Sequence, residues 1–206
     1  MPEKRVLVLY AHPSPHRSEV NQQLIRAAKQ VEGVTVVDLY HDYPTYQINI
    51  DLEQQRLLEH DVIIFQFPLY WYSTPAMLKE WQDLVLEYGF AYGQEGTALH
   101  GKVFFCSLSA GGKAEAYQTD GYNHFTIREI LHPLEQMAKM TGMQYLAPLS
   151  LFSARTARDD GRVASHVQKW RWLLQQLVAD NIDYDQASTL AKLNHYPALQ
   201  TIEDDA

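Results

Sequence analysis

The sequence predicts an α/β protein in which five parallel strands form a doubly wound sheet between two layers of helices. Short apolar runs rich in β-branched residues alternate with segments whose apolar residues recur at helical spacing. The central run, residues 62–65, holds no charge, so we expect a strand buried on both faces. The 206 residues contain no internal repeat and no linker, and they suit one domain with a sizeable core.

The first forty residues are predicted to form a strand–helix–strand unit. Residues 5–10 form an apolar strand, and the prolines of the following loop exclude regular structure there. Ser18 is suited to cap a helix that ends at Gly33. Residues 34–40 then form a second strand, which a right-handed crossover places parallel to the first.

The same alternation continues along the rest of the chain. The further elements are, in order, a helix over 51–59, the central strand, a helix from Pro75 to Glu87, a strand over 103–108, a helix over 125–140, a strand over 144–152 and a helix over 161–179. Ser73 and Thr74 are good N-caps for the helix that follows the central strand. Pro133 is expected to kink or divide its helix, and Pro148 places the last strand at an edge or a bulge. The polar tail, 180–206, is expected to be loosely attached.

Composition excludes several classes of protein. The net charge of −8, with no cluster of Lys and Arg, argues against a nucleic-acid partner. Cys106 is the only cysteine, which excludes an intramolecular disulfide, and its apolar surroundings predict a buried thiol. The first apolar run is too short for a signal peptide, and no stretch approaches a membrane span, so we expect a cytoplasmic location.

The loop after the first strand is suited to bind an anion. Backbone N–H groups at the start of the next helix carry partial positive charge, and His12, Ser18 and Asn21 can add hydrogen bonds. Arg17 adds a charge. The alternative, an ordinary capped loop, remains open on these residues alone. His12 and His16 are four apart, but no third ligand is in view, so no metal site is predicted.

Two more loops follow the third and fourth strands. In the first of these, Pro68 and Leu69 precede three consecutive aromatic residues, Tyr70, Trp71 and Tyr72, which could wall a planar ring or pack in an aromatic core. The other loop runs from Ser109 and Ala110 into Gly111 and Gly112, and paired glycines let the backbone approach a ligand closely. A branched side chain at Gly112 is expected to fill space that such a ligand needs.

The three loops are more informative together than singly. The first, third and fourth strands of a parallel sheet place all of them at one edge, where ligands of open α/β sheets bind. One loop suits a phosphate, one a flat ring, and one offers backbone N–H groups. This combination predicts a ligand like flavin mononucleotide. Tyr117 and His124 follow the third loop, and each can donate or accept a proton near the ring.

Four blocks of sequence carry a family resemblance. They are, in chain order, LYAHPSPHRSEVN, FPLYWYSTPAMLKEW, YGFAYGQEGTALHGK and SAGG. Together they resemble the flavodoxin-like NAD(P)H:quinone reductases, the family of DT-diaphorase and modulator of drug activity B. The resemblance covers about residues 5–180. It is closest to the bacterial flavoproteins that are ancillary subunits of the Kef glutathione-gated potassium-efflux systems, to which DLYHDYPTYQINIDLEQQ is also similar.

The resemblance implies a flavodoxin-like, flavin-binding domain over residues 1–180 and a tail over 181–206. The residues assigned to the cofactor, from the loops and from the resemblance, are His12, Ser18, Glu19, Val20, Asn21, Pro68, Leu69, Tyr70, Trp71, Tyr72, Ser109, Ala110, Gly111 and Gly112. Tyr117 corresponds to the family's active-site tyrosine, and the active-site histidine is matched by His124 with an offset of one place.

The activity implied is two-electron transfer from NADH or NADPH to a quinone, with the two substrates occupying one place in turn. FMN is favoured over FAD, because the short loop after the second strand leaves less room for an adenosine half. The family also implies a homodimer with active sites at the subunit interface. Two alternatives stay open. One is a regulatory subunit docked on a potassium-efflux antiporter at the inner face of the cell membrane, with reductase activity secondary. The other is a flavodoxin-like electron carrier.

Overall fold

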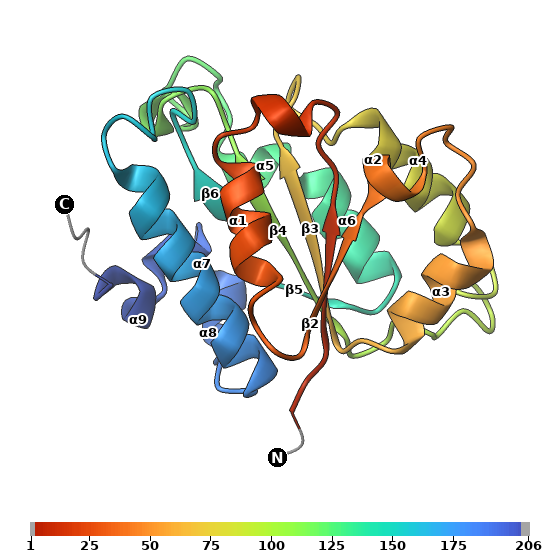
Figure 1. Ribbon diagram of the computed structural model, residues 1–206. Helices are drawn as coiled ribbons and strands as arrows, with labels where there is room; N and C mark the ends of the chain where they lie inside the picture. The colour runs from red at the N-terminus through yellow and green to blue at the C-terminus, as the bar shows by residue number, and fades with distance from the viewer. Residues whose placement is uncertain (1–2, 203–206) are drawn as a thin grey trace.

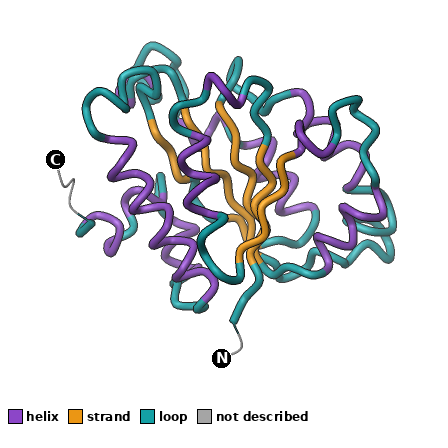
Figure 2. Tube along the Cα trace, in the orientation of Figure 1, coloured by secondary structure: helices purple, strands orange, loops and turns teal. Residues whose placement is uncertain are grey.

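The computed structural model describes residues 3–202. Within them, a fully parallel sheet has the strand order β2-β1-β3-β4-β5, and β6 also pairs with β4 (Figures 1 and 2). The strands are β1 (Val6–Tyr10), β2 (Val34–Asp38), β3 (Val62–Pro68), β4 (Val103–Ser109), β5 (Gln144–Tyr145) and β6 (Leu149–Leu151). This order confirms the predicted doubly wound α/β fold.

Helices cover both faces of the sheet, which makes three layers (Figure 1). Side chains alternate along β1, so Val6 and Val8 join one core cluster while Leu7 and Leu9 join the other. The first cluster lies under α1 (Asn21–Ala28) and α7 (Arg162–Val178). The second lies under α2 (Leu39–Asp42), α3 (Ile50–Leu58), α4 (Ala76–Val85), α5 (Ile127–Ile130) and α6 (His132–Met140).

Two proline predictions can be compared directly with the structure. Pro133 lies in the first turn of α6 and divides the predicted helix into α5 and α6. The predicted strand over 144–152 is two short strands, β5 and β6, and Pro148 lies in the gap between them. Proline has no N–H to donate to a sheet, so the strand is interrupted where Pro148 stands.

Three predicted element ends are wrong. The helix expected from Ser18 begins at Asn21, and the Ser18 hydroxyl accepts a hydrogen bond from the Asn21 N–H at 3.0 Å. The second strand ends at Asp38, whose carboxylate accepts from the His41 N–H and caps α2. Neither Ser73 nor Thr74 caps α4, which begins directly after Pro75 without a side-chain cap.

The expectation of a loosely attached tail is also wrong. Residues 183–200 form α8 (Tyr184–Thr189), the short 3₁₀ helix η3 (Leu193–His195) and α9 (Pro197–Gln200). Ala187, Leu193 and Leu199 are fully buried in the core cluster under α7. Residues 183–200 are therefore part of the packed domain, and residues 203–206 lie outside the part of the chain that the structure describes.

A buried carboxylate ties together the helices beside the aromatic loop. Glu53 on α3 is fully buried and accepts hydrogen bonds from Tyr43 Oη at 2.5 Å and from Trp81 Nε1 on α4 at 2.9 Å. Arg56 forms an ion pair with the same carboxylate and with Asp42. These contacts anchor α4, and with it the loop between β3 and α4.

No helix within residues 3–202 combines the length and apolar character needed to cross a membrane.

Candidate functional site

The ends of β1, β3 and β4 lie level at one edge of the sheet. Tyr10 pairs with Gln66, and Pro68 pairs with Ser109, so the loops that follow these strands leave the sheet side by side (Figure 1). The chain after β6 joins them, because the Ala154 N–H donates to the Ala110 carbonyl at 3.0 Å. Four segments distant in the sequence therefore meet at this edge.

The first hollow at this edge has a volume of about 490 Å³. Its lining residues are His12, Arg17, Ser18, Glu19, Val20, Asn21, Pro68, Tyr70, Ser109, Gly111, Ala154 and Arg155. Nine of them are residues that the sequence assigns to a cofactor. The structure thus brings the predicted anion-binding loop, the aromatic loop and the glycine loop together around one space.

The second hollow lies on the other side of the same loops and has a volume of about 300 Å³. It is lined by Leu69, Trp71, Tyr72, Gly112, Ala116, Tyr117, Tyr122 and Asn123. Pro68 and Tyr70 face the first hollow, whereas Leu69 and Trp71 face the second. The aromatic loop therefore forms a wall of both.

The floor of the first hollow is polar and buried. Asn21 Nδ2 donates to Ser109 Oγ at 2.8 Å, and Gln66 Nε2 donates to the Asn21 carbonyl at 3.3 Å. Asn21 is only 2% exposed, and its Oδ1 atom has no partner among the described residues. Buried polar atoms are almost always hydrogen-bonded, so an unpartnered amide oxygen at this place indicates a missing ligand or water.

Positive charge surrounds the first hollow. Arg17 and Arg155 line it, and neither has an ion-pair partner among residues 3–202. Glu19 also lines it, but its carboxylate is paired with Arg158, whose Nη1 lies 3.2 Å away. Burial, and then the charge of His16, lowers the pKa of His12. The Nδ1 atom of this neutral ring accepts from the Ser14 N–H at 3.1 Å, which leaves the proton on Nε2. These groups favour an anionic ligand.

The aromatic loop is a tight turn rather than a core cluster. Tyr70 and Ser73 exchange backbone hydrogen bonds, and the two residues between them, Trp71 and Tyr72, have φ values of 48° and 63°. Trp71 is 93% exposed, which removes the alternative of an aromatic core. Side chains other than glycine rarely adopt positive φ, and such strain is concentrated at functional sites.

Tyr117 lies at the base of the second hollow. Its ring packs on Phe152, with the centroids 5.0 Å apart. A Cβ atom on Gly112 would come within 3.2 Å of this ring. The sequence predicts that a ligand needs the space beside Gly112, but in the structure Tyr117 occupies it. Burial raises the pKa of Tyr117, so the hydroxyl is protonated at neutral pH and can donate a proton or a hydrogen bond.

Two predicted residues lie outside the linings of these hollows. Ala110 is buried beneath the first hollow, where its N–H donates to the Leu151 carbonyl at 2.8 Å. His124 is exposed, with a φ of 59°, and it lines neither hollow. The structure therefore does not bring His124 together with Tyr117 around either space.

The sequence reasoning missed Ala154 and Arg155 in the first hollow. Both follow β6, the fifth strand position, which ends at the same edge as the other strands. A signal was present, because an arginine directly after a parallel strand lies where ligands bind. Ala116, Tyr122 and Asn123 were missed in the second hollow, where Asn123 accepts a hydrogen bond from Tyr72 Oη at 3.2 Å.

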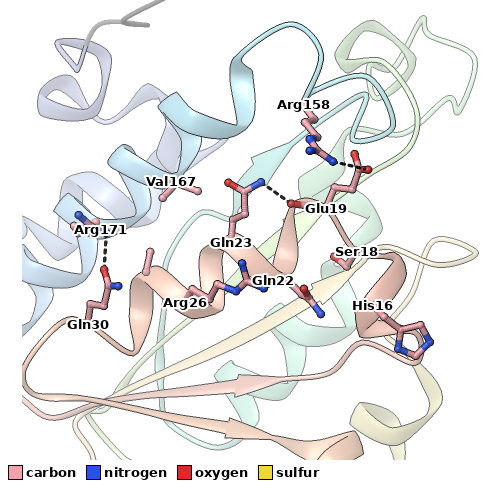
Figure 3. Close-up of a pocket in the computed structure, with 11 residues that line it drawn as sticks. His16, Ser18, Glu19, Gln22, Gln23, Arg26, Gln30, Arg158, Val167 and Arg171 are labelled. Carbon is pink, nitrogen blue, oxygen red and sulfur yellow. Dashed lines mark hydrogen bonds and ion pairs between the residues drawn. The ribbon is translucent and has the colours of Figure 1, made fainter.

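A groove between α1 and α7 adjoins the first hollow at Ser18 and Glu19 (Figure 3). Its lining residues are His16, Ser18, Glu19, Gln22, Gln23, Arg26, Ala27, Gln30, Arg158, Val167 and Arg171. Figure 3 shows Arg171 hydrogen-bonded to Gln30 across the groove, at 2.8 Å. With three arginines and one carboxylate, the groove is locally positive in a chain of net charge −8.

Comparisons with known proteins agree with this geometry. The chain is 45% identical over 174 residues to the glutathione-regulated potassium-efflux system ancillary protein KefG of Cronobacter sakazakii, covering 84% of this chain and 94% of that one. General stress protein 14 of Treponema denticola, solved in complex with FMN, has a TM-score of 0.79 and 34% identity and covers 84% of this chain and 99% of its own.

An NADPH-quinone reductase from P. pentosaceus has a TM-score of 0.73 and 34% identity over 84% of this chain and 97% of that chain. A family model described as the flavodoxin-like fold matches residues 4–174. The chain therefore belongs to the family with the flavodoxin-like fold.

Proposed function

We propose that the protein is an FMN-dependent NAD(P)H:quinone oxidoreductase. The observation that carries the proposal is the pair of hollows on either side of the aromatic loop, one cationic and polar, the other aromatic with Tyr117 at its base. A nucleotide phosphate suits the first, and flat rings suit the second. The FMN complex of the Treponema relative and the quinone reductase neighbour support this assignment.

The residues of the first hollow fit a phosphorylated flavin. Asn21 Oδ1 is buried without a partner, and the guanidinium groups of Arg17 and Arg155 are free to contact a phosphate. At Gly111 an added Cβ atom would meet nothing closer than Arg155 Nε at 4.0 Å, so the backbone is open to a ligand.

When bound, FMN supplies hydride chemistry between a nicotinamide and a quinone. The chain's part is to bind, to orient and to manage protons. Trp71 and Tyr72 would wall the slot in which both substrates stack in turn, as a ping-pong mechanism requires, while Tyr70 faces the first hollow. Tyr117 holds its proton at neutral pH and can donate a hydrogen bond to a quinone oxygen. His124 is the second candidate proton donor, and it would need a change in loop position to contribute.

The purified protein tests the proposal directly. We expect flavin absorbance, release of a ligand with the mass of FMN, and oxidation of NADH or NADPH by a simple benzoquinone. Arg155→Ala is expected to weaken FMN binding about tenfold to a hundredfold, because a charge-assisted contact is lost. Arg171→Ala is the matched control, since Arg171 lines the groove between α1 and α7, pairs with Gln30 there and does not line the first hollow. A colourless protein that neither binds added FMN nor oxidises a nicotinamide would refute the proposal.

Tyr117→Phe separates catalysis from binding in the same assay. The change removes one hydroxyl and leaves the ring on Phe152, so FMN affinity should be unchanged while turnover falls about a hundredfold. His124→Ala serves as the comparison, and an equal fall there would return His124 to the catalytic group. If Tyr117→Phe left turnover unchanged, the tyrosine would have no role as a proton donor.

A second candidate function is that of an ancillary subunit of a potassium-efflux antiporter. The identity of 44–49% to several KefG proteins favours it. The protein would then act as a homodimer docked at the inner face of the cell membrane, with reductase activity secondary. Pull-down with the membrane antiporter, repeated with Tyr117→Phe, tests this role. Binding and stimulated efflux by the inactive variant would favour regulation, whereas no binding by either form would refute it.

A further inference from the structure

The tail covers the outer edge of β6 with a side chain that takes the place of a strand. In a parallel strand the N–H and C=O of one residue point to the same side. The backbone N–H and C=O groups of Leu149 and Leu151 point toward β4, so those of Ser150 point away from it. Asn194 Oδ1 accepts from the Ser150 N–H at 3.0 Å, and Asn194 Nδ2 donates to the Ser150 carbonyl at 3.0 Å. One amide therefore pairs both groups.

The tail is held against this edge by further contacts. The Leu193 N–H donates to the Pro148 carbonyl at 2.9 Å. On the other side, Arg128 donates to the carbonyls of Ser188 at 2.7 Å and Leu190 at 2.6 Å. Asn194 is thus presented to β6 by a segment that is fixed on its N-terminal side at Ser188, Leu190 and Leu193.

The residue that ends β6 leads directly to the second hollow. Phe152 follows Leu151, and its ring packs on Tyr117 at 5.0 Å between centroids. Lys192 of the tail also contacts this ring, because its Nζ lies 5.2 Å from the centroid of Phe152. The next N–H, that of Ser153, donates to the Gly112 carbonyl at 2.8 Å. A displacement of β6 would therefore move the support of Tyr117.

We propose that Asn194 is a positioning residue for Tyr117. By pairing the open edge of β6 it sets where Phe152 lies, and Phe152 sets where the Tyr117 ring lies in the second hollow. The inference rests on the proposed function, which gives Tyr117 its catalytic role. It assigns a task to residues 183–202, which lie beyond the part of the chain that the family model matches.

A pair of asparagines in the C-terminal segment provides the test. Asn194→Ala is expected to lower kcat about tenfold while the KM for the nicotinamide stays within twofold, since a misplaced catalytic group costs turnover more than binding. Asn181→Ala is the matched control, because Asn181 is exposed and contacts only Gln176 in its own turn. If Asn194→Ala behaves as Asn181→Ala does, the inference is overturned.

A double-mutant cycle separates positioning from general loosening of the fold. In a Tyr117→Phe background, Asn194→Ala should change kcat less than twofold, because the group that it positions is already gone. A full tenfold loss in that background would show that Asn194 acts elsewhere and would overturn the inference. Should Asn194→Ala fail to fold, Lys192→Met keeps the packing on Phe152 without the cation, and it should lower kcat about threefold by the same route.

Hydrogen–deuterium exchange of the cofactor-free protein gives a readout that does not depend on activity. Asn194→Ala should speed exchange in residues 149–154 and also in residues 112–117, which connect to the end of β6 through Phe152 and Ser153. Faster exchange confined to 149–151 would overturn the inference. An inactive wild-type protein would instead refute the proposed function, and the exchange result would still decide whether Asn194 holds Tyr117.

Discussion

Replacing Glu53 by alanine is expected to lower the free energy of unfolding by about 3 to 4 kcal/mol. The change leaves two buried donors, Tyr43 Oη and Trp81 Nε1, without their acceptor, at about 1 to 1.5 kcal/mol each. It also leaves Arg56 without its nearer carboxylate. Removing one partner of a buried ion pair costs about 3 to 5 kcal/mol in total. Arg56 keeps Asp42 at 3.5 Å and is 24% exposed, which places the total loss for Glu53→Ala toward the lower end of that range.

Urea unfolding followed by fluorescence measures this loss. With an m-value of about 2 kcal/mol/M, the midpoint should fall by about 1.5 to 2 M. Glu59→Ala, at the end of the same helix, is the matched control. Its carboxylate is exposed and pairs with Arg5 at 3.3 Å, so the urea midpoint should stay close to that of wild type. A loss below about 1 kcal/mol for Glu53→Ala would refute the account of this cluster as an anchor of α4.

Two other changes test a buried histidine and the glycine loop. Burial, with a contribution from Lys169, lowers the pKa of His166 to about 4 from 6.5. Its stabilising effect is therefore present above pH 6.5 and is lost as the pH falls toward 4. Between about pH 7.5 and about pH 4.5, urea titrations should show that wild type loses about 2 to 3 kcal/mol more than His166→Leu, and equal losses would contradict this burial. Gly112→Val should displace Tyr117 and lower turnover, because an added Cβ atom already comes within 3.2 Å of the Tyr117 ring; turnover equal to that of wild type would contradict the placement of Tyr117.

The parts of the fold that sequence could predict are those with a local cause. The strands at residues 6–10, 62–68 and 103–109 begin with continuous apolar runs, because parallel strands are buried on both faces. Once they are parallel, their loops must meet at one edge, which is why most of both hollows was predictable. Pro133 divides its helix for an equally local reason, its missing N–H.

The parts that could not be predicted depend on long-range contacts. Arg155 enters the first hollow because β6 carries it there, and apart from its place after a parallel strand nothing in its own loop indicates this. The tail looked polar because its buried residues, among them Ala187, Leu193 and Leu199, are spread over three short helices without a regular period. His124 lies outside both hollows because of the conformation of its loop, which spacing in the sequence does not determine.

The amide of Asn194 has a consequence for where this protein can be cut. A fragment that stops at residue 174, where the family likeness stops, would contain every strand and yet leave the N–H and C=O of Ser150 facing water. Unpaired edge strands can pair with strands of other molecules, so we expect such a fragment to self-associate. We therefore expect the unit that folds to be longer than the stretch that the family model matches.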